Sequence, residues 1–130
     1  MGQGPELRDN SAAFINYAYT RSSGILRKLG RITEPKAFNL LTDPVEQALI
    51  LELSKFPETF SKAADDLSPT LLCLYANLLA QRFHEFYEKS DISHVSNDEL
   101  KWQRVALVLA VRTVLKTVAG LLGLELAERM

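Results

Sequence analysis

Apolar residues recur every three or four positions over most of this chain, which is the spacing of amphipathic helices. The first such segment runs from about residue 10 to residue 28. Acceptable N-terminal caps precede it at positions 9–11, and Gly30 is placed to end it. Its apolar positions fall mainly on one face of a helix: Phe14, Ala18, Ile25, Leu26 and Leu29.

Prolines and capping residues predict four further helices with short connections. Asp43–Pro44 and Ser68–Pro69 each supply a cap followed by a proline at the first helical position. Gly123 is placed to end the last helix, which begins at a capping pair formed by Ser96 and Glu99. The expected helices are a helix of about 44–55, a short helix after Phe56–Pro57, a helix of about 69–88 and a helix of about 97–121.

No segment alternates in the way a strand would, so the sequence predicts an all-α bundle of about five helices. Residues 10–130 are expected to form one domain. Residues 1–9 are interpreted as a leader, either natural or left from expression. A chain of 130 residues is long enough for one core and too short for two.

Charge limits the kind of nucleic-acid site this chain could carry. Its 15 basic and 16 acidic side chains give a net charge of −1. Proteins that hold nucleic acid mainly through phosphates carry a basic stripe. The near-equal numbers of basic and acidic side chains therefore argue against strong nonspecific binding of nucleic acid. They allow a small local binding site on a larger protein.

The sequence does not predict membrane insertion or metal binding. No run of about 18 apolar residues occurs, and Arg104, Arg112 and Lys116 interrupt the most apolar stretch. Cys73 is the only cysteine, which fits a small core residue in a reducing compartment. One cysteine and two histidines are fewer than the four ligands of a common closed zinc site. We expect a cytoplasmic protein without a metal.

Clustered acids do not form a convincing catalytic site. Asp65–Asp66 and Asp98–Glu99 are adjacent pairs, and neighbouring helical positions point about 100° apart. There is no glycine-rich phosphate loop and no nucleophile paired with a base in sequence. The sequence therefore predicts no independent active site.

Tyr17 and Arg21 are the most suggestive pair for binding. Their i, i+4 spacing places them side by side on a helix. An aromatic ring beside a guanidinium can stack on an unpaired base and bond to its edge. The alternative is a tyrosine at the core margin covered by the arginine, which is the commoner arrangement. The same alternative applies to Tyr75.

Ordered motifs along nearly the whole chain resemble the C-terminal domain of arginyl-tRNA synthetases, called the DALR anticodon-binding domain. Ile15-Asn-Tyr17-Ala-Tyr-Thr-Arg21 is similar to the Tyr-Ala-x-x-Arg helix that opens that domain. The segment from Pro69 through Tyr75 and Leu79 to Tyr87 resembles its middle. The terminal Glu128-Arg129-Met130 resembles its end, although Ala127 stands where the family often has proline.

The resemblance implies an α-helical bundle that grips the anticodon loop of arginine tRNA, with the middle cytosine of the anticodon as a principal identity element. It implies neither DNA nor a membrane as a partner. The residues that it carries over to the anticodon site are Phe14, Tyr17, Arg21, Tyr75, Leu79, Arg129 and Met130.

The family's catalytic motifs, His-Ile-Gly-His and Lys-Met-Ser-Lys-Ser, have no counterpart here. The resemblance thus implies a parent enzyme whose catalytic domain, in the same chain, joins arginine to tRNA with ATP and magnesium. This fragment would need no cofactor. Two alternatives remain: the related domain of a cysteinyl- or glycyl-tRNA synthetase, and a helical protein-interaction module that does not bind tRNA.

Overall fold

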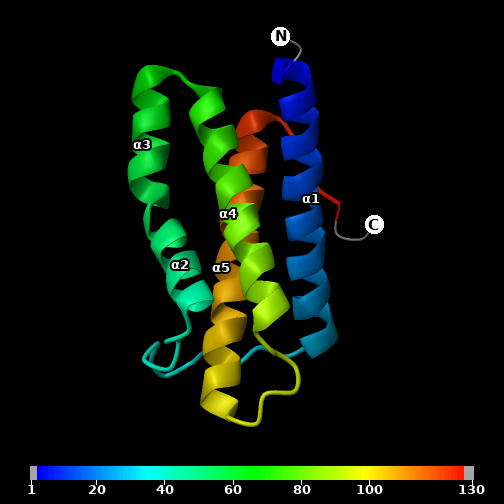
Figure 1. The fold of residues 1–130 in the computed structure, drawn as a ribbon, viewed down its shortest axis with the longest axis vertical. Helices are drawn as coiled ribbons and strands as arrows, with labels where there is room; N and C mark the ends of the chain where they lie inside the picture. The colour runs from blue at the N-terminus through cyan, green and yellow to red at the C-terminus, as the bar shows by residue number, and fades with distance from the viewer. Residues whose placement is uncertain (1–2, 128–130) are drawn as a thin grey trace.

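The computed structural model describes residues 3–127, with side chains described from residue 13 onward, and it is helical without strands over that range. Five helices follow one another along the chain (Figure 1). This confirms the predicted all-α bundle. The helices are α1 (Gln3–Leu29), α2 (Pro44–Ser54), α3 (Phe56–Asp66), α4 (Pro69–Lys89) and α5 (Asp98–Leu122).

The predicted start of the first helix was wrong. α1 begins at Gln3, so the capping residues at positions 9–11 lie inside the helix. Pro5 does not prevent this, because it falls in the first turn, where backbone N–H groups have no helical partner to lose. Whether residues 1–9 are a leader stays a prediction.

The other helix ends lie close to their predicted positions. The capping box of α2 is formed, with Val45 N donating to Asp43 Oδ1 at 3.0 Å. Gly30 and Gly123 end α1 and α5 with φ angles of 70° and 74°, a conformation that favours glycine. The cap of α5 is Asn97 rather than Ser96, because the Asn97 side chain accepts from Leu100 N at 3.1 Å.

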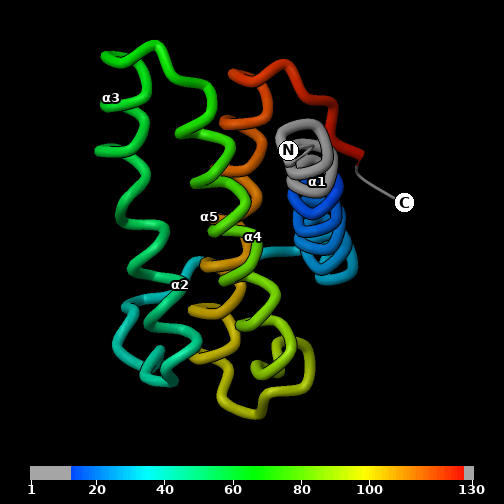
Figure 2. Tube along the Cα trace, turned by 45° about the horizontal axis from the view of Figure 1, so that its top comes forward, coloured from blue at the N-terminus to red at the C-terminus, as the bar shows by residue number. Residues whose placement is uncertain are grey.

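α4 and α5 form the centre of the bundle. α1 packs on one side of this pair, and α2 and α3 lie on the other side (Figures 1 and 2). The core lies where the inner faces of these helices meet. Its largest fully buried apolar side chains are Ile15, Tyr19, Leu41, Leu49, Leu79, Phe83, Phe86 and Leu115.

α5 is also long and apolar enough to cross a membrane by length and composition alone. Its apolar residues include a buried stripe, with Val108, Val111 and Leu115 each fully buried, and it packs against α1, α2 and α4. Two of its charged residues bond to neighbouring helices. Arg104 pairs with Glu46 of α2, and Arg112 Nε donates to Ser23 Oγ of α1 at 2.8 Å. These contacts are those of the core helix of a bundle.

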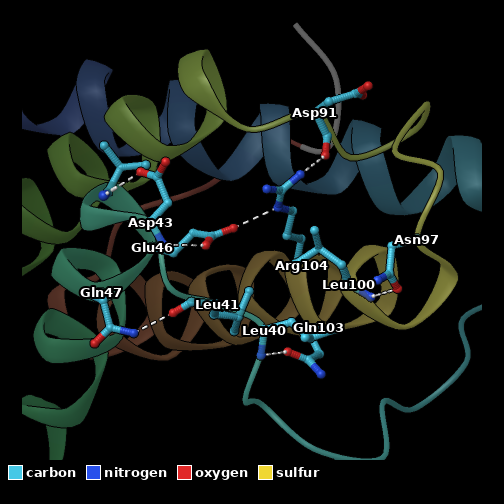
Figure 3. A network of polar contacts seen from close by, with 11 residues as sticks. Leu40, Leu41, Asp43, Glu46, Gln47, Asp91, Asn97, Leu100, Gln103 and Arg104 are labelled. Carbon is cyan, nitrogen blue, oxygen red and sulfur yellow. Dashed lines mark hydrogen bonds and ion pairs between the residues drawn. The ribbon is translucent and has the colours of Figure 1, made fainter.

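A buried ion pair joins α2 to α5. Arg104 Nε donates to Glu46 Oε2 at 2.7 Å, and the Glu46 side chain is 1% exposed (Figure 3). The second oxygen of Glu46 accepts from Asp43 N, and Arg104 Nη1 donates to the carbonyl oxygen of Asp91. One carboxylate and one guanidinium therefore tie together α2, α5 and the loop between α4 and α5.

The connector between α1 and α2 is bonded to the start of α5. Glu99 Oε2 accepts from Lys36 N at 2.8 Å and from Ala37 N at 3.2 Å. The buried Gln103 accepts from Leu40 N at 2.9 Å, and its amide nitrogen donates to Glu99 Oε2. This Gln103 bond and the backbone donors lower the pKa of Glu99. Glu99 thus anchors the connector instead of capping α5.

Replacing Glu46 with alanine would leave Arg104 mostly buried without its carboxylate partner. Breaking one side of a buried ion pair costs roughly 3–5 kcal/mol. We expect Glu46→Ala to lower the free energy of unfolding, measured in urea, by about 3 kcal/mol. The control is Glu58→Ala, an exposed carboxylate of α3, which should lower it by less than about 1 kcal/mol. Equal losses in both variants would contradict the role given to the pair.

Candidate nucleic-acid interface

Tyr17 and Arg21 lie side by side on α1, as their spacing predicts, and both contact side chains of α4. The Tyr17 side chain is 41% exposed, and the Arg21 guanidinium donates to its hydroxyl group. The central carbon of the guanidinium is 4.8 Å from the centre of the Tyr17 ring and 4.5 Å from that of Tyr87 on α4. Arg21 therefore makes cation–π contacts with the rings of two helices.

A histidine supports this pair from α4. The ring centres of His84 and Tyr17 are 4.9 Å apart, and their planes are inclined by only 24°. Phe14 contacts the same imidazole at 4.8 Å. We call Phe14, Tyr17, Arg21, His84 and Tyr87 the Tyr17 cluster. It is a continuous set of rings and one guanidinium along the α1–α4 contact.

The surroundings of His84 favour the neutral form of its imidazole. Burial lowers its pKa, and the positive charge of Arg21 lowers it further, whereas Glu88 acts in the opposite direction. Its Nε2 atom is buried, and no residue in the described part of the chain forms a hydrogen bond with it. The ring thus contributes a flat, uncharged surface to the cluster.

A groove of about 660 Å³ begins at the cluster and continues along the C-terminal half of α1. Tyr17, Arg21 and Tyr87 line one part of it, and Lys28 and the loop of residues 90–94 line another. The lining of the groove has mixed charges, because it includes Glu88 and Asp91 as well as Arg21 and Lys28. Such a lining suits the polar edges of bases better than a run of phosphates.

The C-terminal tail is bonded to α1 beside the cluster. Ala127 N donates to Asn16 Oδ1 at 2.9 Å, and Thr20 Oγ1 donates to the Ala127 carbonyl oxygen at 2.7 Å. Asn16 and Thr20 immediately precede Tyr17 and Arg21 in sequence. The bond from Ala127 N is one that proline could not make. The predicted contacts Arg129 and Met130 lie outside the described residues.

Tyr75 and Leu79 occupy a different place from the one the resemblance implies. They are 6% and 0% exposed, and the Tyr75 hydroxyl donates to the Glu52 carbonyl oxygen at 2.7 Å. Burial, followed by the charge of Glu52, raises the pKa of Tyr75. Both residues belong to the apolar stripe of α4 that forms the core. We therefore correct their expected role and remove them from the candidate interface.

His84 and Tyr87 are the members of the cluster that the sequence did not point to. They are three positions apart on α4, so they share a face, but that spacing is common on helices. Their importance depends on α1 lying against that face, which local sequence does not reveal.

Cys73 is partly exposed. No three His, Cys, Asp or Glu side chains in the described part of the chain gather where they could hold a metal ion.

The lowered pKa of His84 predicts that acid destabilises the fold. The unfolded chain binds a proton at the ordinary pKa of 6.5, whereas folded His84 binds it only at lower pH. The free energy of unfolding should therefore fall as the pH drops below about 6.5, and His84→Phe should reduce this slope. His94→Gln is the control, because His94 is 89% exposed. Identical slopes in the wild-type and His84→Phe proteins would contradict the prediction.

Comparison with known proteins identifies the family of this chain. The family described as "DALR anticodon binding domain" matches residues 15–130. The arginine–tRNA ligase of Pyrococcus abyssi is 40% identical over 125 residues, which cover 92% of this chain and 20% of the ligase. That of Ignicoccus hospitalis is 37% identical over 121 residues, covering 93% of this chain and 19% of the ligase.

The fold agrees with these matches. The solved structure of Thermus thermophilus arginyl-tRNA synthetase superimposes with a TM-score of 0.77 at 29% identity, covering 91% of this chain and 21% of that one. The chain thus spans about one fifth of the length of the relatives it matches. These matches favour the arginyl family over the cysteinyl or glycyl alternative. The chain belongs to the DALR anticodon-binding domain family and is homologous to the C-terminal part of arginine–tRNA ligases.

Proposed function

We propose that this chain reads the anticodon loop of arginine tRNA and does so through the Tyr17 cluster. The observation that carries the proposal is the exposed Tyr17 ring, fixed beside the Arg21 guanidinium at the edge of a groove. Single-stranded RNA loops are commonly recognised in this way, by stacking of unpaired bases on aromatic rings and by bonds to base edges.

An unpaired base would stack on the exposed part of the Tyr17 ring. Stacking on an aromatic side chain contributes roughly 1–3 kcal/mol per base and does not distinguish one base from another. Selection therefore falls to Arg21, whose guanidinium carries five N–H donors in a fixed plane. Cytosine presents two neighbouring acceptors, its O2 and N3 atoms, and Arg21 can donate to both. We propose the middle anticodon cytosine as that base.

The cluster is suited to this task because it is already ordered in the free protein. The rings of Tyr17 and Tyr87 hold the Arg21 guanidinium from two helices, so little side-chain freedom remains to be lost on binding. The net charge of −1 provides no general attraction for phosphates. The affinity of the chain alone should therefore come from a few specific contacts, with more supplied by the parent enzyme.

The remaining parts of the reaction belong to that parent enzyme. We propose that a catalytic domain of the same parent chain joins arginine to tRNA, using ATP and magnesium, in the cytoplasm. The present chain would contribute recognition without a cofactor of its own. DNA and membranes are not part of the proposal.

Truncating either residue of the central pair should weaken RNA binding without unfolding the protein. We expect Tyr17→Ala and Arg21→Ala each to raise the Kd for an anticodon stem-loop of arginine tRNA by about tenfold at fixed salt. Fluorescence titration would measure the Kd, and circular dichroism would check helicity. Arg82→Ala is the matched control: Arg82 pairs with Glu85 at 3.2 Å on the surface of α4, so the same charge is lost elsewhere.

An unchanged Kd in both variants, with helicity retained, would overturn the proposal. Absence of binding by the wild-type chain would instead favour the alternative of a helical interaction module. A rise in Kd for Arg82→Ala equal to that for Arg21→Ala would show that only overall charge matters.

The tail should contribute because it is bonded to α1 next to the cluster. Removing residues 128–130 is expected to raise the Kd by about two- to tenfold. Asn16→Ala removes the acceptor for Ala127 N and should act in the same direction, whereas Asn16→Asp keeps an acceptor and should act less. Wild-type affinity in both the truncated chain and Asn16→Ala would exclude the tail from the interface.

A further inference from the structure

We propose that His84 is a positioning residue of the anticodon site: its imidazole ring, stacked on Tyr17, supports the Tyr17 ring from the protein side and sets the plane on which a base stacks. This inference rests on the function proposed above. It assigns to α4 a role in reading the base, although His84 itself does not line the groove.

The packing around the imidazole supports this role. The rings of His84 and Tyr17 lie nearly parallel, with an angle of 24° and a centre separation of 4.9 Å, which is a stacked arrangement. Phe14 on α1 and Phe83 on α4 contact the same imidazole, with ring centres 4.8 and 5.8 Å away. The imidazole is thus fixed from two helices. Through it, the tilt of the Tyr17 ring is fixed relative to α4.

The flat face of the His84 ring, rather than its polar atom, is what contacts the cluster. His84 Nε2 is buried and has no hydrogen-bond partner among the described residues. A buried polar atom without a partner is destabilising, so the nitrogen adds nothing to the packing and an apolar ring could take its place. The cluster therefore requires a small flat ring that stays uncharged beside Arg21.

The charged groups around His84 agree with an uncharged ring. Arg21 acts on it from α1 and opposes its protonation, while Glu88 acts on it from α4 and partly offsets Arg21. A protonated imidazole would place a second positive charge in the cluster and disfavour the position of the Arg21 guanidinium. At neutral pH His84 therefore supplies an uncharged ring, and Arg21 supplies the positive charge.

The test compares three proteins on two RNAs. The RNAs are the anticodon stem-loop of arginine tRNA and the same stem-loop with only the middle cytosine replaced. The Kd for the altered stem-loop divided by the Kd for the natural stem-loop measures base discrimination. Partial unfolding raises both Kd values by the same factor and so does not change this ratio. We expect His84→Ala to reduce the ratio by about fivefold. We expect His84→Phe, which restores a flat ring, to return it to within about twofold of the wild-type value.

Leu74→Ala is the matched control, since Leu74 is 53% exposed on the same helix. It should leave the ratio unchanged. The Tyr17 ring protons give an independent signature in the free protein, because they should shift in the NMR spectrum of His84→Ala and less in that of His84→Phe.

A wild-type ratio in His84→Ala would overturn the positioning role while leaving the proposed function intact. Equal losses in His84→Ala and His84→Phe would also overturn it, since the imidazole nitrogens rather than the flat ring would then be required. A wild-type protein without any preference for the cytosine would instead refute the proposed function, and the inference with it.

Discussion

Packing of α1 against α4 is the contact on which the candidate interface depends. Tyr17 and Arg21 come from α1, whereas the rings that hold them, His84 and Tyr87, come from α4. Neither helix alone forms the cluster. A shift of one helix along the other would separate Arg21 from Tyr87 and Tyr17 from His84 together. The bundle therefore acts as a scaffold that fixes the geometry of the exposed Tyr17 and the half-buried Arg21.

Other contacts keep that packing in place from a distance. The Glu46–Arg104 pair (Figure 3) holds α2 on α5, and the bonds of Glu99 hold the connector there. α5 in turn packs against α1 and α4. The tail bonds to Asn16 and Thr20 on α1 itself. Polar groups between elements thus determine their relative positions, while the apolar stripes supply most of the burial.

Local sequence signals predicted most of the fold. Pro44, Pro69 and Gly123 each act within one helical turn, so the ends that they mark are close to those observed. The start of α1 was missed because a cap residue can also lie inside a helix. The Tyr17–Arg21 contact was predictable because both residues are on one helix, at a spacing that makes them neighbours.

The rest of the interface depends on contacts between helices. Tyr75 and His84 are both polar aromatic residues on α4, and the sequence pointed only to Tyr75. Tyr75 faces Glu52 and the core, whereas His84 faces α1. Which face of α4 meets α1 is determined by the packing of the whole bundle, and helical spacing alone does not specify it.

The most direct test of this account is an NMR titration that follows the Tyr17 ring protons and the Arg21 side-chain N–H groups. The ligands are two anticodon stem-loops of arginine tRNA that differ only in the middle base. Stacking on Tyr17 and donation by Arg21 predict large shifts of both signals with cytosine and much smaller shifts without it. Equal shifts with both RNAs, or shifts confined to residues far from Tyr17, would contradict the account.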